Sequence, residues 1–138
     1  MPQDINADRI ALQDLMLTYA AAIDERDRER YAACFADDVE VVGFGSGPIQ
    51  GRAAWLDYVF SALGNYRTTQ HLLAPSMISL EGNSASVRTD VQATHVLTES
   101  ETDQRLILRA TYHSRARRTG DGWQIYRHEL VVRDLQAS

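Results

Sequence analysis

The stretch ASVRTDVQATHVL, from Ala85 to Leu97, decides the fold because apolar and polar side chains alternate along its whole length. One set of alternate positions holds Ala85, Val87, Thr89, Val91, Ala93, His95 and Leu97, and the other holds Ser86, Arg88, Asp90, Gln92 and Thr94. A period of two is typical of a strand with one buried face. The pattern therefore predicts a long strand on which His95 lies with the apolar set.

Two more long strands are expected after this one, from Gln104 to Arg117 and from Trp123 to Arg133, joined by the turn sequence TGDG. Shorter strands are expected before it, from Thr68 to Leu73 and from Met77 to Glu81. Because the long strands follow one another with short turns, we expect them to be antiparallel.

The first half of the chain is helical in pattern. Apolar residues at three- and four-residue steps predict a helix from Ala7 to Ile23, with Asn6 or Asp4 as its N-cap. Asp27 can cap a short second helix, a strand is expected over Val39–Phe44, and a third helix over Arg52–Leu63. Helices first and long strands second predict an α+β fold: a strongly curved sheet wrapped around about three helices, enclosing a pocket.

Composition narrows the function. A chain of 138 residues, 44% hydrophobic, suits a single domain over residues 1–138. The net charge of −5 argues against nucleic acid as a partner. The start of the chain lacks a signal-peptide pattern and no apolar run is long enough for a membrane, so we expect a cytoplasmic protein. The single cysteine, Cys34, is expected to be a small core residue.

Several polar residues stand on apolar faces or where charge is unfavourable. Asp24 ends the first helix, where a carboxylate opposes the helix dipole by ~0.3–1 kcal/mol when it is exposed. His71 lies in the uncharged run TTQHLL, and alternation groups His128 with Tyr126 and Leu130. Taken singly, Asp24 is more simply explained as a solvated residue at a helix end, and each histidine as a hydrogen-bonded core residue. Only their combination indicates a site.

The order Y…D…FADD…GR…H, followed by long strands and a DGW turn, resembles the SnoaL-like branch of the nuclear transport factor 2-like superfamily over nearly the whole chain. That resemblance implies a cone-shaped fold. This branch includes scytalone dehydratase, bile acid dehydratase and hexachlorocyclohexane dehydrochlorinase. Resemblance to these enzymes implies a catalytic aspartate late in the first helix and a catalytic histidine in the strand after the third helix. Those positions are Asp24 and His71 here, while Tyr19 and His128 stand where the dehydrochlorinase has a lysine and an arginine.

The resemblance implies a lyase that needs no cofactor and no metal. We expect Asp24 to orient His71, which removes a proton from carbon as a general base. Tyr19, His95 and His128 are candidates to hold or protonate the leaving group. Water, halide or a small carbon fragment would be lost from a hydrophobic cyclic or aromatic substrate.

Other functions remain open at this point. The same pocket could serve an isomerase or cyclase, and the same fold could be a non-catalytic ligand-binding or scaffold domain or the small subunit of a ring-hydroxylating dioxygenase. The family implies a homodimer or homotrimer. Aromatic residues expected to line the pocket and bind substrate are Trp55, Tyr58, Phe60, Tyr112 and Tyr126.

Overall fold

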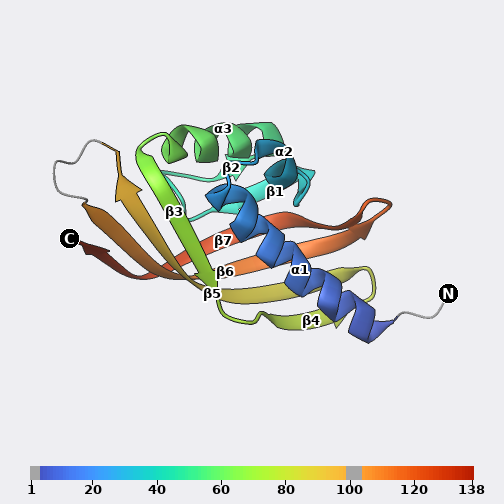
Figure 1. Ribbon diagram of the computed structural model, residues 1–138. Coiled ribbons are helices and arrows are strands. Elements are labelled where there is room, and N and C mark those ends of the chain that lie inside the picture. Colours follow the sequence, from blue (N-terminus) through green and yellow to red (C-terminus); the bar gives the residue numbers. More distant parts are fainter. Residues whose placement is uncertain (1–3, 99–103) are drawn as a thin grey trace.

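The computed structural model describes residues 4–98 and 104–138, which form three helices and seven strands (Figure 1). The helices are α1 (Ile5–Asp24), α2 (Arg28–Ala32) and α3 (Arg52–Leu63). The strands are β1 (Phe35–Val42), β2 (Ile49–Gln50), β3 (Tyr66–Leu73), β4 (Met77–Glu81), β5 (Ser84–Leu97), β6 (Arg105–Thr119) and β7 (Gly122–Ala137). No helix in the described part of the chain is both long and apolar enough to span a membrane.

All seven strands belong to one sheet, in the order β2-β1-β7-β6-β5-β3, with β4 paired to β5. The long strands β5, β6 and β7 are antiparallel neighbours, as predicted. Strand β1 pairs with β7 in parallel, so the sheet is mixed. The helices lie along one side of this curved sheet, with α1 crossing it obliquely and α2 and α3 near one end (Figure 1). The α+β cone predicted from the sequence is confirmed.

Local capping explains where the first two helices begin. The side chain of Asp4 accepts a hydrogen bond from the backbone N–H of Ala7 at 3.0 Å, so Asp4 rather than Asn6 is the N-cap of α1. Asp27 caps α2 in the same way, through the N–H of Arg30. The buried side of α1 includes Leu12, Met16, Tyr19 and Ile23.

The core joins these helices to the inner face of the sheet through aromatic side chains. Tyr31, Phe35 and Trp55 are almost completely buried, and their rings meet edge to face. Cys34 is buried beside them, and burial raises the pKa of its thiol to about 12. The thiol is therefore protonated and unreactive at neutral pH, in keeping with the predicted core role.

Pairing across the sheet extends two strands beyond their predicted limits. Strand β1 begins at Phe35 rather than at Val39, because Phe35 pairs with Ile125 of β7. At the other end, β7 continues to Ala137, which pairs with Leu106. The sequence pattern within one strand does not identify the distant residues with which that strand pairs.

A β-bulge in β7 reverses one prediction about which residues share a face. Arg115 pairs with Arg127, but the next residue of β6, Ala116, pairs with Ile125, so Tyr126 is an extra residue. Ile125 and His128 are consequently both buried. Tyr126 lies on the outer face, where the guanidinium carbon of Arg117 is 5.4 Å from its ring centroid. The prediction that Tyr126 and His128 share a face is wrong.

Candidate active site

A cavity of about 310 Å³ lies between the helices and the inner face of the sheet. Its wall is aromatic and aliphatic, with a few hydroxyl and imidazole groups, and no lysine, arginine, aspartate or glutamate is among the described residues that line it. The lining residues are Tyr19, Ile23, Tyr31, Phe44, Trp55, Tyr58, Val59, Ala62, Leu63, Tyr66, His71, His95, Leu106, Leu108, Tyr112, Leu130 and Leu135. Such a wall suits an uncharged, largely apolar ligand.

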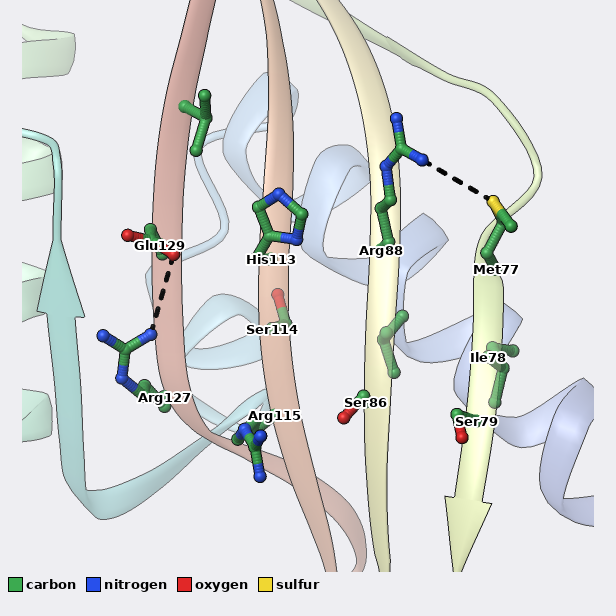
Figure 2. Close-up of a pocket in the computed structure, with 12 residues that line it drawn as sticks. Met77, Ile78, Ser79, Ser86, Arg88, His113, Ser114, Arg115, Arg127 and Glu129 are labelled. Carbon is green, nitrogen blue, oxygen red and sulfur yellow. Dashed lines mark hydrogen bonds and ion pairs between the residues drawn. The ribbon is translucent and has the colours of Figure 1, made fainter.

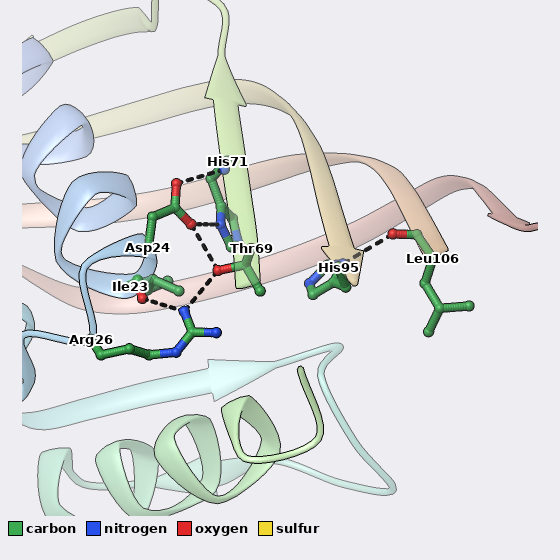
Figure 3. Close-up of polar contacts among 7 residues, drawn as sticks. All are labelled: Ile23, Asp24, Arg26, Thr69, His71, His95 and Leu106. Carbon is green, nitrogen blue, oxygen red and sulfur yellow. Dashed lines mark hydrogen bonds and ion pairs between the residues drawn. The ribbon is translucent and has the colours of Figure 1, made fainter. Parts of the chain in front are cut away.

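The side chains of Asp24 and His71 are in contact, as the family resemblance implied, and His71 lines this cavity. The Nδ1 atom of His71 is 2.8 Å from Oδ1 of Asp24, and the backbone N–H of His71 donates to Oδ2 at 2.8 Å. The side chain of His71 is 8% exposed and that of Asp24 is 21% exposed. Asp24 is the last residue of α1, and these donors from β3 compensate a carboxylate placed at the unfavourable end of a helix (Figure 3).

The protonation of the pair follows from its hydrogen bonds. Burial acts to raise the pKa of the Asp24 carboxyl, but hydrogen bonds from the side chain and backbone of His71, with that of Thr69, outweigh it and leave the pKa below its ordinary value. An ionised carboxylate only accepts hydrogen bonds, so Nδ1 of His71 carries the ring proton. In the neutral form of the ring, the other nitrogen, Nε2, has a lone pair and can act as a base.

Two residues that the sequence did not single out complete this cluster. The hydroxyl of Thr69 donates to Oδ1 of Asp24 at 3.0 Å, and Nη1 of Arg26 donates to Oγ1 of Thr69 at 2.8 Å (Figure 3). Thr69 lies two positions before His71 on the same strand, so alternation places both on one face. That spacing was a usable signal for Thr69, whereas no pattern indicated Arg26.

His95 lies beside His71, on the inner face where alternation placed it. The two rings meet edge to face with centroids 5.8 Å apart, and Nδ1 of His95 is 3.4 Å from the carbonyl oxygen of Leu106. Because a carbonyl only accepts, this contact assigns the ring proton to Nδ1. Burial lowers the pKa of His95 and the neighbouring His71 lowers it further, so the ring is neutral at pH 7 and offers Nε2 as an acceptor.

His128 forms a separate, fully buried cluster behind the cavity wall. Its Nε2 is 2.9 Å from the hydroxyl of Tyr19 and its Nδ1 is 2.8 Å from the hydroxyl of Ser114. Burial lowers the pKa of His128 to about 3, so the ring is neutral. His128 is not among the residues that line the cavity. Tyr19 is, but its hydroxyl already has a partner in His128.

The predicted substrate-binding aromatics divide into two groups. Trp55, Tyr58 and Tyr112 line the cavity. Phe60 does not; it packs against Tyr31, with the guanidinium carbon of Arg28 5.3 Å from its ring centroid. Tyr126 is on the outer face because of the β7 bulge. Three lining aromatics that the sequence reading had not selected are Tyr31, Phe44 and Tyr66.

A second hollow, of about 530 Å³, lies on the opposite face of the sheet and is a less suitable site (Figure 2). It is bordered by arginines of three strands, including Arg88 and Arg127, and Arg127 makes an ion pair with Glu129. No imidazole forms an ion pair with a carboxylate among the described residues that border it. In the described chain as a whole, no three His, Cys, Asp or Glu side chains converge as a metal site requires.

Comparison with known proteins gives relatives along nearly the full length. Residues 5–129 match the family described as SnoaL-like domain. An uncharacterised protein of Mycobacterium tuberculosis is 30% identical over 125 residues, which are 88% of this chain and 82% of that protein.

Solved structures with the same fold include proteins with named activities. A candidate aromatic ring hydroxylase from Novosphingobium aromaticivorans is 27% identical, with a TM-score of 0.87 and coverage of 99% of this chain and 96% of that chain. A candidate scytalone dehydratase from the same species is 24% identical, with a TM-score of 0.87 and coverage of 95% and 87%. A hexachlorocyclohexane dehydrochlorinase from Novosphingobium barchaimii is 22% identical, with a TM-score of 0.84 and coverage of 96% and 91%. The last two likenesses show the fold alone.

Proposed function

The chain belongs to the SnoaL-like domain family, and from this premise we propose that it is a cofactor-independent lyase acting on an uncharged cyclic or aromatic small molecule. The observation that carries the proposal is the hydrogen-bonded pair of Asp24 and His71 at an aromatic-lined cavity. The names of two structural neighbours, a dehydratase and a dehydrochlorinase, point to the same class of reaction.

The proposed chemistry is a β-elimination. Nε2 of His71 takes a proton from a substrate carbon, and the electron pair of that C–H bond forms the new C=C bond. The leaving group departs from the adjacent carbon with its own bonding pair, either as halide or as water once the proton taken by His71 is passed to the departing hydroxyl. The Asp24 carboxylate holds His71 in the reactive tautomer and stabilises the imidazolium that forms.

The other polar groups of the cavity hold the substrate in this proposal. The neutral ring of His95 accepts a hydrogen bond from a substrate hydroxyl. Tyr112 lines the cavity, and burial raises the pKa of its hydroxyl; a hydrogen bond with Tyr19 acts against this rise, and the charge of Asp24 adds to it. The Tyr112 hydroxyl is therefore a hydrogen-bond donor to the leaving group rather than an acid at neutral pH. Tyr19 and His128, whose polar atoms bond each other, support the wall behind.

The test is turnover of scytalone and of hexachlorocyclohexane by the purified protein, followed by mass spectrometry for loss of water or of hydrogen chloride. We expect His71→Ala and Asp24→Asn each to lower the rate by about 10²- to 10⁴-fold while the circular dichroism spectrum stays the same. Matched controls are His113→Ala and Asp57→Asn, since both residues are exposed and neither lines the cavity. Rates in the two dyad variants equal to those of the controls would remove His71 and Asp24 from the mechanism.

A second candidate function follows from the neighbour described as an aromatic ring hydroxylase. In that case we expect the chain to bind a larger catalytic partner and to show no turnover alone. Purification from the native cells, with analysis of iron and of any co-purifying chain, separates the two proposals. Turnover by the isolated protein favours the lyase.

A further inference from the structure

Arg26 occupies an unusual place immediately after α1. Its φ is 59°, in the left-handed region, and it is the one non-glycine residue with positive φ in residues 4–98 and 104–138. Side chains with a Cβ atom rarely adopt this conformation, and glycine or asparagine is better suited to it. The backbone here therefore gives no reason for an arginine.

The side chain of Arg26 also carries an unfavourable feature. It is half-buried, and its Nη2 atom is buried without a hydrogen-bond partner among the described residues. A buried donor left without an acceptor is costly, and most are satisfied in native proteins. An arginine in this position therefore needs a compensating interaction, which its other nitrogen provides.

That interaction is a chain of hydrogen bonds whose direction is fixed by chemistry. Nη1 of Arg26 donates to the carbonyl of Ile23 and to Oγ1 of Thr69, both at 2.8 Å. Because the guanidinium has no acceptor, the Thr69 oxygen accepts, and the single hydroxyl proton of Thr69 is directed to Oδ1 of Asp24 (Figure 3). The donors of Thr69 and His71 therefore converge on the Asp24 carboxylate, and Arg26 acts on it through Thr69.

We propose that Arg26 is a positioning residue for the base: through Thr69 it fixes the rotation of the Asp24 carboxylate, and so keeps the ring proton of His71 on Nδ1 and the free Nε2 toward the cavity. Its importance for catalysis rests on the proposed function, but its effect on the tautomer of His71 does not. With Arg26 absent, the Thr69 hydroxyl is free to rotate its proton toward another acceptor. The carboxylate then loses one of the donors that set its plane.

The first test is nuclear magnetic resonance of the full chain, following the ¹⁵N shifts of the His71 ring and the ¹³C titration of the Asp24 carboxyl. Thr69→Val keeps the shape of the side chain and removes the hydroxyl, so we expect a mixture of His71 tautomers and a higher pKa for Asp24. Thr69→Ser restores the hydroxyl and should restore both signals. Thr68→Val is the matched control, because Thr68 is the exposed neighbour on the same strand.

The second test separates positioning from packing at residue 26. Arg26→Gly relieves the left-handed backbone, so the fold should be retained, yet we expect the tautomer mixture seen in Thr69→Val. Arg26→Lys keeps a cationic donor and should rescue the single tautomer. With hexachlorocyclohexane as the probe, we expect Arg26→Gly to lower turnover on the order of 10- to 100-fold relative to Arg26→Lys.

The outcomes separate the two proposals. A wild-type spectrum in both Thr69→Val and Arg26→Gly would overturn the positioning role, whatever the activity. Absence of wild-type turnover on scytalone and hexachlorocyclohexane would count against the proposed lyase, while the spectra would still decide the role of Arg26.

Discussion

His71 and His128 are both imidazoles held by hydrogen bonds to the first helix, yet their surroundings give them opposite properties. His71 has an ionised carboxylate on one nitrogen, and its side chain lines the cavity. His128 has a neutral hydroxyl on each nitrogen and no exposed surface. A histidine on an apolar face is thus a candidate base only when one nitrogen remains unbonded and a charge stabilises its protonated form.

The largest effect expected from this contrast is a crossed result between two substitutions. His71→Ala should lower turnover by about 10²-fold or more and change the free energy of unfolding little. His128→Leu should do the reverse, because it leaves the buried hydroxyls of Tyr19 and Ser114 without their partner, at a cost of roughly 2–5 kcal/mol. Urea unfolding and turnover per folded molecule measure the two effects. Equal loss of activity in both variants would contradict the division into a reactive and a structural histidine.

The burial of His128 as a neutral ring should also make the free energy of unfolding depend on pH. The folded-state pKa of His128 is about 3, below the value of ~6.5 expected when unfolded, so the unfolded chain binds the proton first. The contribution of the neutral, buried His128 ring to the free energy of unfolding is complete above pH 6.5 and is lost as the pH falls toward 3. At pH 5 the loss is about 2 kcal/mol. The difference in unfolding free energy between wild type and His128→Asn, measured from pH 7 to 5, isolates this contribution. A constant difference would show that His128 is not buried as a neutral ring.

The smallest effect expected is that of Tyr19→Phe. The substitution keeps the ring packing of Tyr19 against Tyr31 and Tyr112 and removes the hydroxyl that meets His128. We expect a loss of roughly 1–2 kcal/mol in the free energy of unfolding, since Nε2 of His128 is left unpaired. The rate on the probe substrates should fall much less than in His71→Ala. A fall in turnover as large as in the His71 and Asp24 variants would show that the Tyr19 hydroxyl takes part in the reaction.

Much of this architecture could be predicted from the sequence because it depends on local signals. Alternation set the long antiparallel strands, and the caps Asp4 and Asp27 set the starts of two helices. The meeting of Asp24 with His71 followed from family resemblance, and the structure places the two side chains in contact.

The parts that could not be predicted depend on pairing between distant strands. The start of β1 at Phe35 needs its partner in β7, and the outward turn of Tyr126 needs the register between β6 and β7. Arg26 was missed for a different reason: a left-handed backbone at a residue with a side chain has no signature in composition or period. Ser114 was missed because a hydroxyl on a predicted strand is ordinary until its partner, His128, is located.

The extra residue in β7 has a consequence for how cavities of this kind diverge. Substitution changes one lining side chain at a time, and removing Tyr126 would restore regular pairing with Ile125 and His128 both still inward; moving the extra residue to another position in β7 would instead exchange the faces of all residues between its old and new positions. With the extra residue after His128 instead of before it, Arg127 would point inward and His128 outward. The position of the extra residue along β7 is therefore a route by which related chains with nearly the same composition acquire different ligand specificities.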